Sequence, residues 1–255
     1  MQDYRLDSAL LKDHIEGRRQ GEGAMGVCVV TGVGPGNGIA IVNRFARQGY
    51  QVAMLARNTE RLQAWADAEP NAHAFPTDIT SAEQITETFA AIRKQLGPVD
   101  VLVHNAGTGT FSSFVDTSPE QLNSALETNV FGLLYCGQES VSDMLAKGSG
   151  AVIVTGATAS LRGGANFAGF APAKAAQRSL CQSMARSLGP QGVHVAYLII
   201  DGIIDSERTR RMIPAKTDDD FINPKAIADV VYQLAHQDKS CWTFELDIRP
   251  YTENW

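Results

Sequence analysis

A glycine-rich turn near the start of the chain is the clearest sign of chemistry in the sequence. Residues 31–40 read TGVGPGNGIA, directly after an apolar run and directly before an amphipathic stretch. Glycines let the backbone approach a pyrophosphate, and the free N–H groups that begin the following helix favour negative charge. The turn therefore predicts a dinucleotide-binding loop. Its predicted cofactor-binding residues are Gly32, Gly36, Asn37, Gly38 and Ile39.

The charge after the second apolar run indicates which dinucleotide is preferred. Arg57 follows residues 51–56, at the place where an acidic side chain would bind both ribose hydroxyls of NAD(H). A guanidinium suits a 2′-phosphate instead, so the sequence predicts NADP(H) as the cofactor. Asp78 and Ile79 follow the third run and are expected at the same site. The Asp78 carboxylate could accept a hydrogen bond from the adenine amine, or cap the helix near Ser81.

Further motifs occur in the order typical of one protein family. Residues 104–107 read HNAG, Asn129 begins NVFG, and residues 201–206 read DGIIDS. Together with the glycine loop, these motifs resemble the short-chain dehydrogenase/reductase family from about residue 27 to about residue 248. The resemblance implies a Rossmann fold of about seven strands and a homodimer or homotetramer. It also implies a role in cofactor binding for Asn105, Ala106, Gly107, Gly202 and Ile204.

The catalytic signature of this family is Tyr-x-x-x-Lys, and the chain departs from it. Residues 170–174 read FAPAK, so Lys174 is present and Phe170 stands where the resemblance places the proton-donating tyrosine. A phenyl ring has no proton to give. A positioned general acid contributes about 10²–10⁴-fold to a rate, so ordinary ketone reduction should be strongly impaired. The resemblance implies that Lys174 holds the nicotinamide ribose.

Two other catalytic positions are implied by the same resemblance. Asn129 falls where the family has an asparagine that organises a proton relay. The serine position of the family best matches Ala157, and Thr158 is one residue later. We therefore expect Thr158 to face the reacting group, where its hydroxyl could polarise a carbonyl.

Three interpretations are compatible with a site that lacks the tyrosine. Another group could donate the proton, such as Arg162, His104, Asp201 or a water held by Asn129 and Lys174. The substrate could need no donor, because hydride addition to an iminium carbon gives a neutral amine. The site could instead catalyse a cyclisation, isomerisation or dehydration, or only bind a ligand. Because the cofactor features occur together, we favour an NADP(H)-dependent reductase acting on a carbonyl or imine carbon of a small to medium hydrophobic substrate.

Substrate-binding residues are expected at the carboxyl ends of the strands. Arg162 lies in the loop LRGG at residues 161–164 and suits an anionic substrate or an intermediate. Asp201 begins the segment of about 201–223, where this fold commonly carries a substrate loop. The histidines and cysteines show no metal-ligand spacing, so no metal is expected.

The elements that must position these residues alternate along the chain. The predicted strands are 27–31, 51–56, 72–76, 99–104, 151–155, 193–200 and 243–248. The predicted helices are roughly 38–48, 59–68, 81–96, 118–147, 168–188 and 225–236. Strands that alternate with helices indicate right-handed βαβ units. The predicted fold is therefore a Rossmann-type, doubly wound α/β fold, with a mainly parallel seven-stranded sheet and helices on both faces.

Composition is consistent with a globular enzyme of this class. The chain has 255 residues, 44% of them hydrophobic, and a formal net charge of -6, which argues against a nucleic-acid partner. No apolar run reaches the roughly 20 residues that a membrane span needs. Four widely spaced cysteines favour reduced thiols and a cytoplasmic location. Residues 1–25 are predicted to be a leader with a short helix, and residues 26–255 a single dinucleotide-binding domain.

Overall fold

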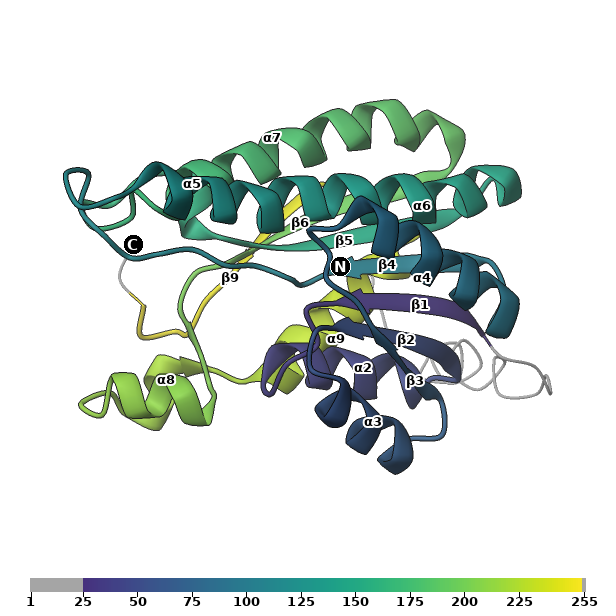
Figure 1. Cartoon of the computed structure of the whole chain (residues 1–255), viewed down its shortest axis with the longest axis horizontal. Helices are drawn as coiled ribbons and strands as arrows, with labels where there is room; N and C mark the ends of the chain where they lie inside the picture. The colour runs from purple at the N-terminus through teal and green to yellow at the C-terminus, as the bar shows by residue number, and fades with distance from the viewer. Residues whose placement is uncertain (1–24, 254–255) are drawn as a thin grey trace, which may run out of the picture.

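A seven-stranded sheet forms the centre of the protein, and every hydrogen-bonded pair of strands in it is parallel (Figure 1). The computed structural model describes residues 25–253, so the predicted N-terminal helix lies outside the described residues. The strands, in the order β3-β2-β1-β4-β5-β6-β9, are β1 (Gly26–Thr31), β2 (Tyr50–Ala56), β3 (Ala72–Pro76), β4 (Val99–His104), β5 (Gly150–Ala157), β6 (Val193–Ile200) and β9 (Glu245–Ile248). The order reverses between β1 and β4, which creates a crevice at the carboxyl ends of these strands.

Helices cover both faces of the sheet, as predicted. They are α2 (Asn37–Ala46), α3 (Thr59–Ala68), α4 (Ala82–Gln95), α5 (Pro119–Leu126), α6 (Gly132–Lys147), α7 (Ala171–Leu188), α8 (Glu207–Met212) and α9 (Pro224–Ala235). Helices α2, α3 and α9 lie on one face, and α4, α6 and α7 lie on the other (Figure 1). Within residues 25–253, no helix is both long and apolar enough to cross a membrane.

Alternate residues of the same strand supply two separate hydrophobic cores. In β6, Val195 and Tyr197 pack in the core under α4, α6 and α7. Their neighbours Ala196 and Leu198 pack in the core under α2 and α9. Side chains of a strand point alternately to opposite faces, so a strand covered on both sides must be apolar throughout. All eight residues of β6 are buried for this reason.

Helix boundaries differ from the predictions mainly around Asn129. The predicted helix 118–147 is interrupted by a π-helical turn (Glu127–Phe131) between α5 and α6. The Asn129 side chain stabilises this turn, since its Nδ2 donates to the carbonyls of Ala125 at 2.7 Å and Thr108 at 2.6 Å. Helix α7 begins at Ala171 rather than at residue 168, which leaves its proline in the first turn, where the missing N–H has no cost.

The segment after β6 leaves the main sheet and returns to it. It contains the two-residue strands β7 (Ile203–Ile204) and β8 (Phe221–Ile222), which pair in parallel, with α8 between them. Arg210 on α8 forms ion pairs with Asp205 at 2.5 Å and Asp218 at 2.6 Å. These ion pairs connect α8 to the residue after β7 and to the segment before β8.

Gly192 provides a test of backbone packing at a place remote from the crevice. Residues with a side chain rarely adopt its φ of +88°, and a Cβ on Gly192 would overlap the carbonyl of Gly148. We expect Gly192→Ala to lower the free energy of unfolding by about 2 kcal/mol or more, measured by urea denaturation.

The matched control for this variant is Gly163→Ala. Gly163 is exposed and has no positive φ, and among residues 25–253, apart from its chain neighbours, the nearest atom to an added Cβ would be the Cβ of Ala171 at 4.0 Å. The control should change stability by less than about 0.5 kcal/mol. Equal losses in both variants would contradict the backbone argument.

Candidate functional site

Two cavities meet at the carboxyl ends of the central strands. The first has a volume of about 690 Å³ and the second about 390 Å³, and both are lined by Asn105 and Gly107. The predicted residues that line the first cavity are Asn37, Asn105, Gly107, Thr158, Arg162, Phe170, Lys174, Asp201, Gly202 and Ile204. Those that line the second are Gly32, Arg57, Asp78, Ile79, Asn105, Ala106 and Gly107. The fold therefore brings together most of the residues that the sequence singled out.

The glycine loop packs closely against the turn that follows β4. A Cβ on Gly32, whose φ is +67°, would overlap the backbone of Ala106, and a Cβ on Gly38 would lie 2.8 Å from the Cα of Val33. Asn105 joins the two segments, because its Nδ2 donates to the Gly32 carbonyl at 3.0 Å and its Oδ1 accepts from Asn37 Nδ2 at 2.6 Å. This cradle has no space for side chains and leaves the start of α2 accessible from the crevice.

Buried polar atoms around the cavities have unused hydrogen-bonding capacity. Within residues 25–253, Asn37 Oδ1 and Asn129 Oδ1 are buried and have no hydrogen-bond partner. Unsatisfied polar atoms are costly in a protein interior and are uncommon, so each one calls for a partner such as an ordered water or a bound group. Asn37 lines the first cavity, and Asn129 lies behind Gly107, which lines both cavities.

Lys174 lies at the inner end of the first cavity and is nearly fully buried, with 5% of its surface exposed. Its Nζ donates to the Thr155 carbonyl at 3.1 Å and to Gln177 Oε1 at 2.9 Å. Burial lowers the pKa of this ammonium from 10.5 to about 8. The group is therefore charged at neutral pH, with one N–H left for a ligand.

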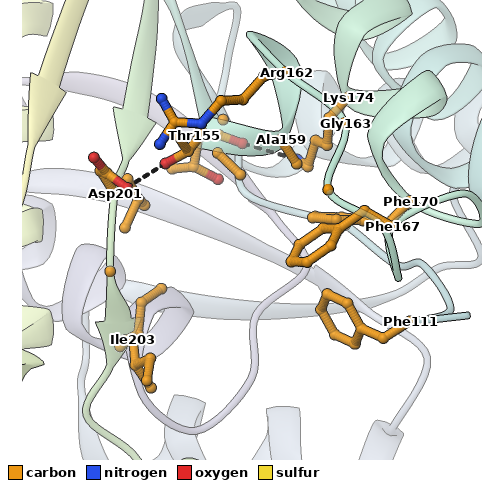
Figure 2. Close-up of a pocket in the computed structure, with 18 of the residues that line it drawn as sticks. Phe111, Thr155, Ala159, Arg162, Gly163, Phe167, Phe170, Lys174, Asp201 and Ile203 are labelled. Carbon is orange, nitrogen blue, oxygen red and sulfur yellow. Dashed lines mark hydrogen bonds between the residues drawn. The ribbon is translucent and has the colours of Figure 1, made fainter. Parts of the chain in front are cut away.

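Three phenylalanines form one side of the first cavity (Figure 2). The ring of Phe111 lies 5.2 Å from that of Phe167 and 5.6 Å from that of Phe170, measured between centroids. Phe170 immediately precedes α7, four residues before Lys174. We call these three residues the phenylalanine cluster. Phe111 is 63% exposed at the mouth of the cavity, so the cluster presents aromatic surface to a ligand.

Polar groups line the other side of the cavity, among them Thr158, Arg162 and Asp201; Figure 2 labels Arg162 and Asp201. Thr158 Oγ1 donates to Asp201 Oδ1 at 2.5 Å, and Asp201 Oδ2 lies 3.4 Å from Arg249 Nη1. The Thr158 hydroxyl proton is thus directed at a carboxylate. Toward the cavity, this hydroxyl offers an acceptor rather than a donor.

The second cavity contains the residues predicted to select the cofactor. Arg57 is exposed at its rim. Asp78 Oδ1 accepts from the backbone N–H of Thr80 at 3.0 Å and from its hydroxyl at 2.8 Å, and these bonds lower the pKa of the carboxyl. The cap of α4 is Ser81, whose side chain accepts from the N–H of Gln84. Asp78 therefore orders the turn before the helix and is not its cap.

The other predicted residues support the cavities from outside. Gly38 packs on Val33, whereas Gly36 and Ile39 border a separate surface hollow beside α9. Asn129 lies behind Gly107, where an added Cβ would be 3.2 Å from its Oδ1. His104 is fully buried at the end of β4, and burial lowers its pKa to about 3, so it is a neutral imidazole at pH 7 and a poor proton donor.

Sequence analysis missed the phenylalanine cluster and Gln177. Phe167 lies three residues before Phe170, the first residue of segment 170–174. This spacing in the sequence could have indicated that these two rings lie close together. Phe111 comes from the loop after β4, so only the tertiary fold shows that the three rings meet. Gln177 is three residues after Lys174, a spacing that places both side chains on one helix face.

Comparisons with known proteins agree with the fold. The family model of short chain dehydrogenases matches residues 26–216. An uncharacterized oxidoreductase of Staphylococcus aureus (strain USA300) is 29% identical over 226 residues, 88% of this chain and 96% of the relative. A crystal structure of a short-chain dehydrogenase from Rhodopseudomonas palustris has a TM-score of 0.75 and 33% identity, over 89% of this chain and 99% of that one.

A third similar protein carries a ligand in its solved structure. The alcohol dehydrogenase from the archaeon Thermococcus sibiricus, complexed with 5-hydroxy-NADP, has a TM-score of 0.78 and 26% identity. The match covers 89% of this chain and 97% of that one.

The burial of Lys174 predicts a distinctive dependence of stability on pH. Its pKa is about 8 in the folded protein against 10.5 for the free side chain, so unfolding takes up a proton between these values. Raising the pH from 8 to 10.5 should therefore stabilise the wild type relative to Lys174→Met, by roughly 3 kcal/mol at most. Urea denaturation at several pH values measures this difference.

Lys94, which is exposed on α4, supplies the control for this measurement. Lys94→Met should show the same pH dependence as the wild type. If the curve for Lys174→Met also runs parallel to the wild type, the ammonium is not titrating as its burial requires.

Proposed function

The chain belongs to the short-chain dehydrogenase/reductase family, and on that premise we propose that it is an NADP(H)-dependent oxidoreductase that delivers a hydride to a carbonyl or iminium carbon. The observation that carries the proposal is the pair of cavities joined at Asn105 and Gly107, one bordered by Arg57 and the other by Lys174. A dinucleotide is long enough to need both cavities. The proposed substrate is a small to medium hydrophobic molecule.

The residues of the two cavities fit NADP(H) in chemical terms. Arg57 would bind the 2′-phosphate, since a guanidinium pairs well with a phosphate. The tight cradle of Gly32 and Gly38 would allow the pyrophosphate to reach the first N–H groups of α2. Lys174 would donate its remaining N–H to the nicotinamide ribose. The complex of the Thermococcus sibiricus alcohol dehydrogenase with 5-hydroxy-NADP supports the same ligand class.

NADPH supplies a hydride from C4 of its nicotinamide, and the chain's own residues would determine which acceptor can use it. A ketone accepts the hydride and also needs a proton on its oxygen. Phe170 stands at the family's proton-donor position and has no acidic hydrogen. The Thr158 hydroxyl donates to Asp201, so it is also engaged. The lack of an acidic hydrogen on Phe170 and the bond from Thr158 to Asp201 both argue against assisted ketone reduction.

An iminium ion fits the same groups better than a ketone does. Hydride addition to its carbon cancels the positive charge and gives a neutral amine, while the nitrogen keeps its proton. No further proton is needed, so atoms and charges balance without a general acid. The free lone pair of Thr158 and the Asp201 carboxylate suit an iminium N–H, and the phenylalanine cluster suits a planar cation. This preference refines the proposal and makes Thr158 and Asp201 substrate-binding residues.

Other parts of the proposal concern the setting of the reaction. Arg162 would contact an anionic or polar group of the substrate at the open side of the cavity. Segment 201–223 would act as the substrate loop, with Gly202 and Ile204 next to the cofactor. We also propose a cytoplasmic homodimer or homotetramer.

The first test is a comparison of affinity for NADPH and NADH. Arg57→Asp should weaken NADPH by roughly 10- to 100-fold, since it removes a charge-assisted hydrogen bond, and should change NADH much less. Fluorescence titration measures both constants. Arg61→Asp, an exposed arginine on α3, is the control for surface charge. An equal loss for the two cofactors would refute the role of Arg57, and no binding of either would refute the proposed function.

The second test compares two acceptors of similar shape, 3,4-dihydroisoquinolinium, whose nitrogen carries a proton, and 1-tetralone. NADPH oxidation followed by absorbance should be at least about 100-fold more efficient with the iminium compound, because only the ketone requires a proton donor. Phe170→Tyr should raise ketone reduction by at least tenfold and leave iminium reduction within about threefold.

The control for this substitution is Phe167→Tyr, which adds a hydroxyl to the same phenylalanine cluster at a position not aligned with Lys174. It should not promote ketone reduction. A wild type that prefers the ketone would contradict the iminium assignment. Tight NADPH binding with turnover of neither compound would favour a cyclase, isomerase or dehydratase.

A further inference from the structure

Gln177 connects two parts of the site that the proposed function treats separately. It lies on α7 and is fully buried. Its Oε1 accepts from Lys174 Nζ at 2.9 Å, and its Nε2 donates to the backbone carbonyl of Asn129 at 2.8 Å. A single amide thus bridges the buried ammonium and the π-helical turn.

The orientation of this amide is determined by its neighbours. An ammonium is only a donor and a carbonyl is only an acceptor, so the amide must turn its oxygen to Lys174 and its nitrogen to Asn129. The Tyr197 hydroxyl has one proton, which is shared between the Lys174 carbonyl at 3.4 Å and Gln177 Oε1 at 3.5 Å. The reversed amide would place an N–H against the ammonium and an oxygen against the carbonyl. Gln177 is therefore locked with its negative end toward Lys174.

The groups that face Lys174 give it no negative partner. Three titratable side chains lie near it, on three elements: His104 on β4, Cys181 on α7 and Tyr197 on β6. Burial keeps all three neutral at pH 7, because it lowers the pKa of His104 and raises the pKa of Cys181 and Tyr197. Within residues 25–253, Lys174 forms no ion pair. Among the described residues, the hydrogen bonds to its ammonium are those to the carbonyls of Thr155 and Gln177.

A neutral acceptor at this place has a specific physical advantage. A carboxylate would keep Lys174 protonated but would cancel the positive charge that attracts a ligand. An aliphatic side chain would leave the ammonium one acceptor short and the Asn129 carbonyl without a donor. An amide supports the charge, leaves it uncancelled and ties it to the turn that holds Asn129.

We propose that Gln177 is a positioning residue that keeps the buried Lys174 ammonium charged, so that its remaining N–H is available at the cofactor end of the cavity. The part of this inference that concerns NADP(H) rests on the proposed function. The part that concerns the protonation of Lys174 holds for the protein by itself. The two parts can be tested separately.

The direct test is an NMR titration of the cofactor-free protein labelled with ¹³Cε-lysine, with Lys174→Met used to assign the signal. The wild-type signal should titrate with a midpoint near pH 8. Gln177→Leu should lower the midpoint by about one unit, since it removes a hydrogen bond to the charged form, and Gln177→Glu should raise it by at least as much. Gln182→Leu, a glutamine later on α7, should leave it unchanged.

The second readout is the affinity for NADPH between pH 6 and pH 9. Gln177→Leu should bind nearly as well as the wild type at pH 6, where both ammonium groups are charged, and up to about tenfold more weakly above pH 8. Damage to the fold alone would weaken binding equally at every pH, and that result would overturn the positioning role.

The outcomes separate this inference from the proposed function. An unchanged midpoint in Gln177→Leu would overturn the inference, whatever the cofactor affinity. If that variant does not fold, Gln177→Glu decides the question, because a midpoint equal to the wild type in it would also overturn the inference. A shifted midpoint in a protein that binds no NADPH would uphold the role of Gln177 toward Lys174 and refute the proposed cofactor.

Discussion

The burial of one ammonium group, that of Lys174, is the constraint on which the rest of the site depends. A charge removed from water must be compensated by hydrogen bonds, and two carbonyl oxygens provide them here. One belongs to the end of β5, and the other is held in place by the carbonyl of Asn129. The π-helical turn, the carboxyl end of a central strand and the first part of α7 are therefore positioned relative to one nitrogen atom.

Hydrogen bonds within the protein also explain which polar groups the first cavity offers to a ligand. Donors such as Asn37 Nδ2 and the Thr158 hydroxyl are already bonded to protein acceptors, at 2.6 Å and 2.5 Å. The groups that remain accessible include an ammonium N–H at the inner end, the Arg162 guanidinium and oxygen lone pairs on one side, and aromatic faces on the other. A cavity of this kind can bind and orient a reactant without exchanging a proton with it.

Much of the fold could be predicted from the sequence, because strands covered on both faces must be apolar and the glycine loop has a defined place after the first of them. The π-helical turn could not be predicted, since Asn129 stabilises it through a contact with Thr108, 21 residues away in the chain. The direction of the Thr158 hydroxyl proton depends on Asp201, which directly follows β6, whereas Thr158 directly follows β5. The phenylalanine cluster also needs the loop after β4. Each of these features is decided by tertiary distances rather than by local pattern.

The contrast between exposed Arg57 and buried Lys174 has a consequence for the ionic conditions under which the protein works. Mobile ions screen charges at the surface over about 8–10 Å at physiological salt, but they do not enter a buried site. If both side chains act as proposed, the discrimination between the phosphorylated and unphosphorylated cofactor weakens as salt rises. The hydrogen bond from Lys174 to the ribose, which both cofactors would accept, stays nearly constant in strength. The preference for the phosphorylated cofactor and the binding of its ribose would then respond differently to the same change in salt concentration.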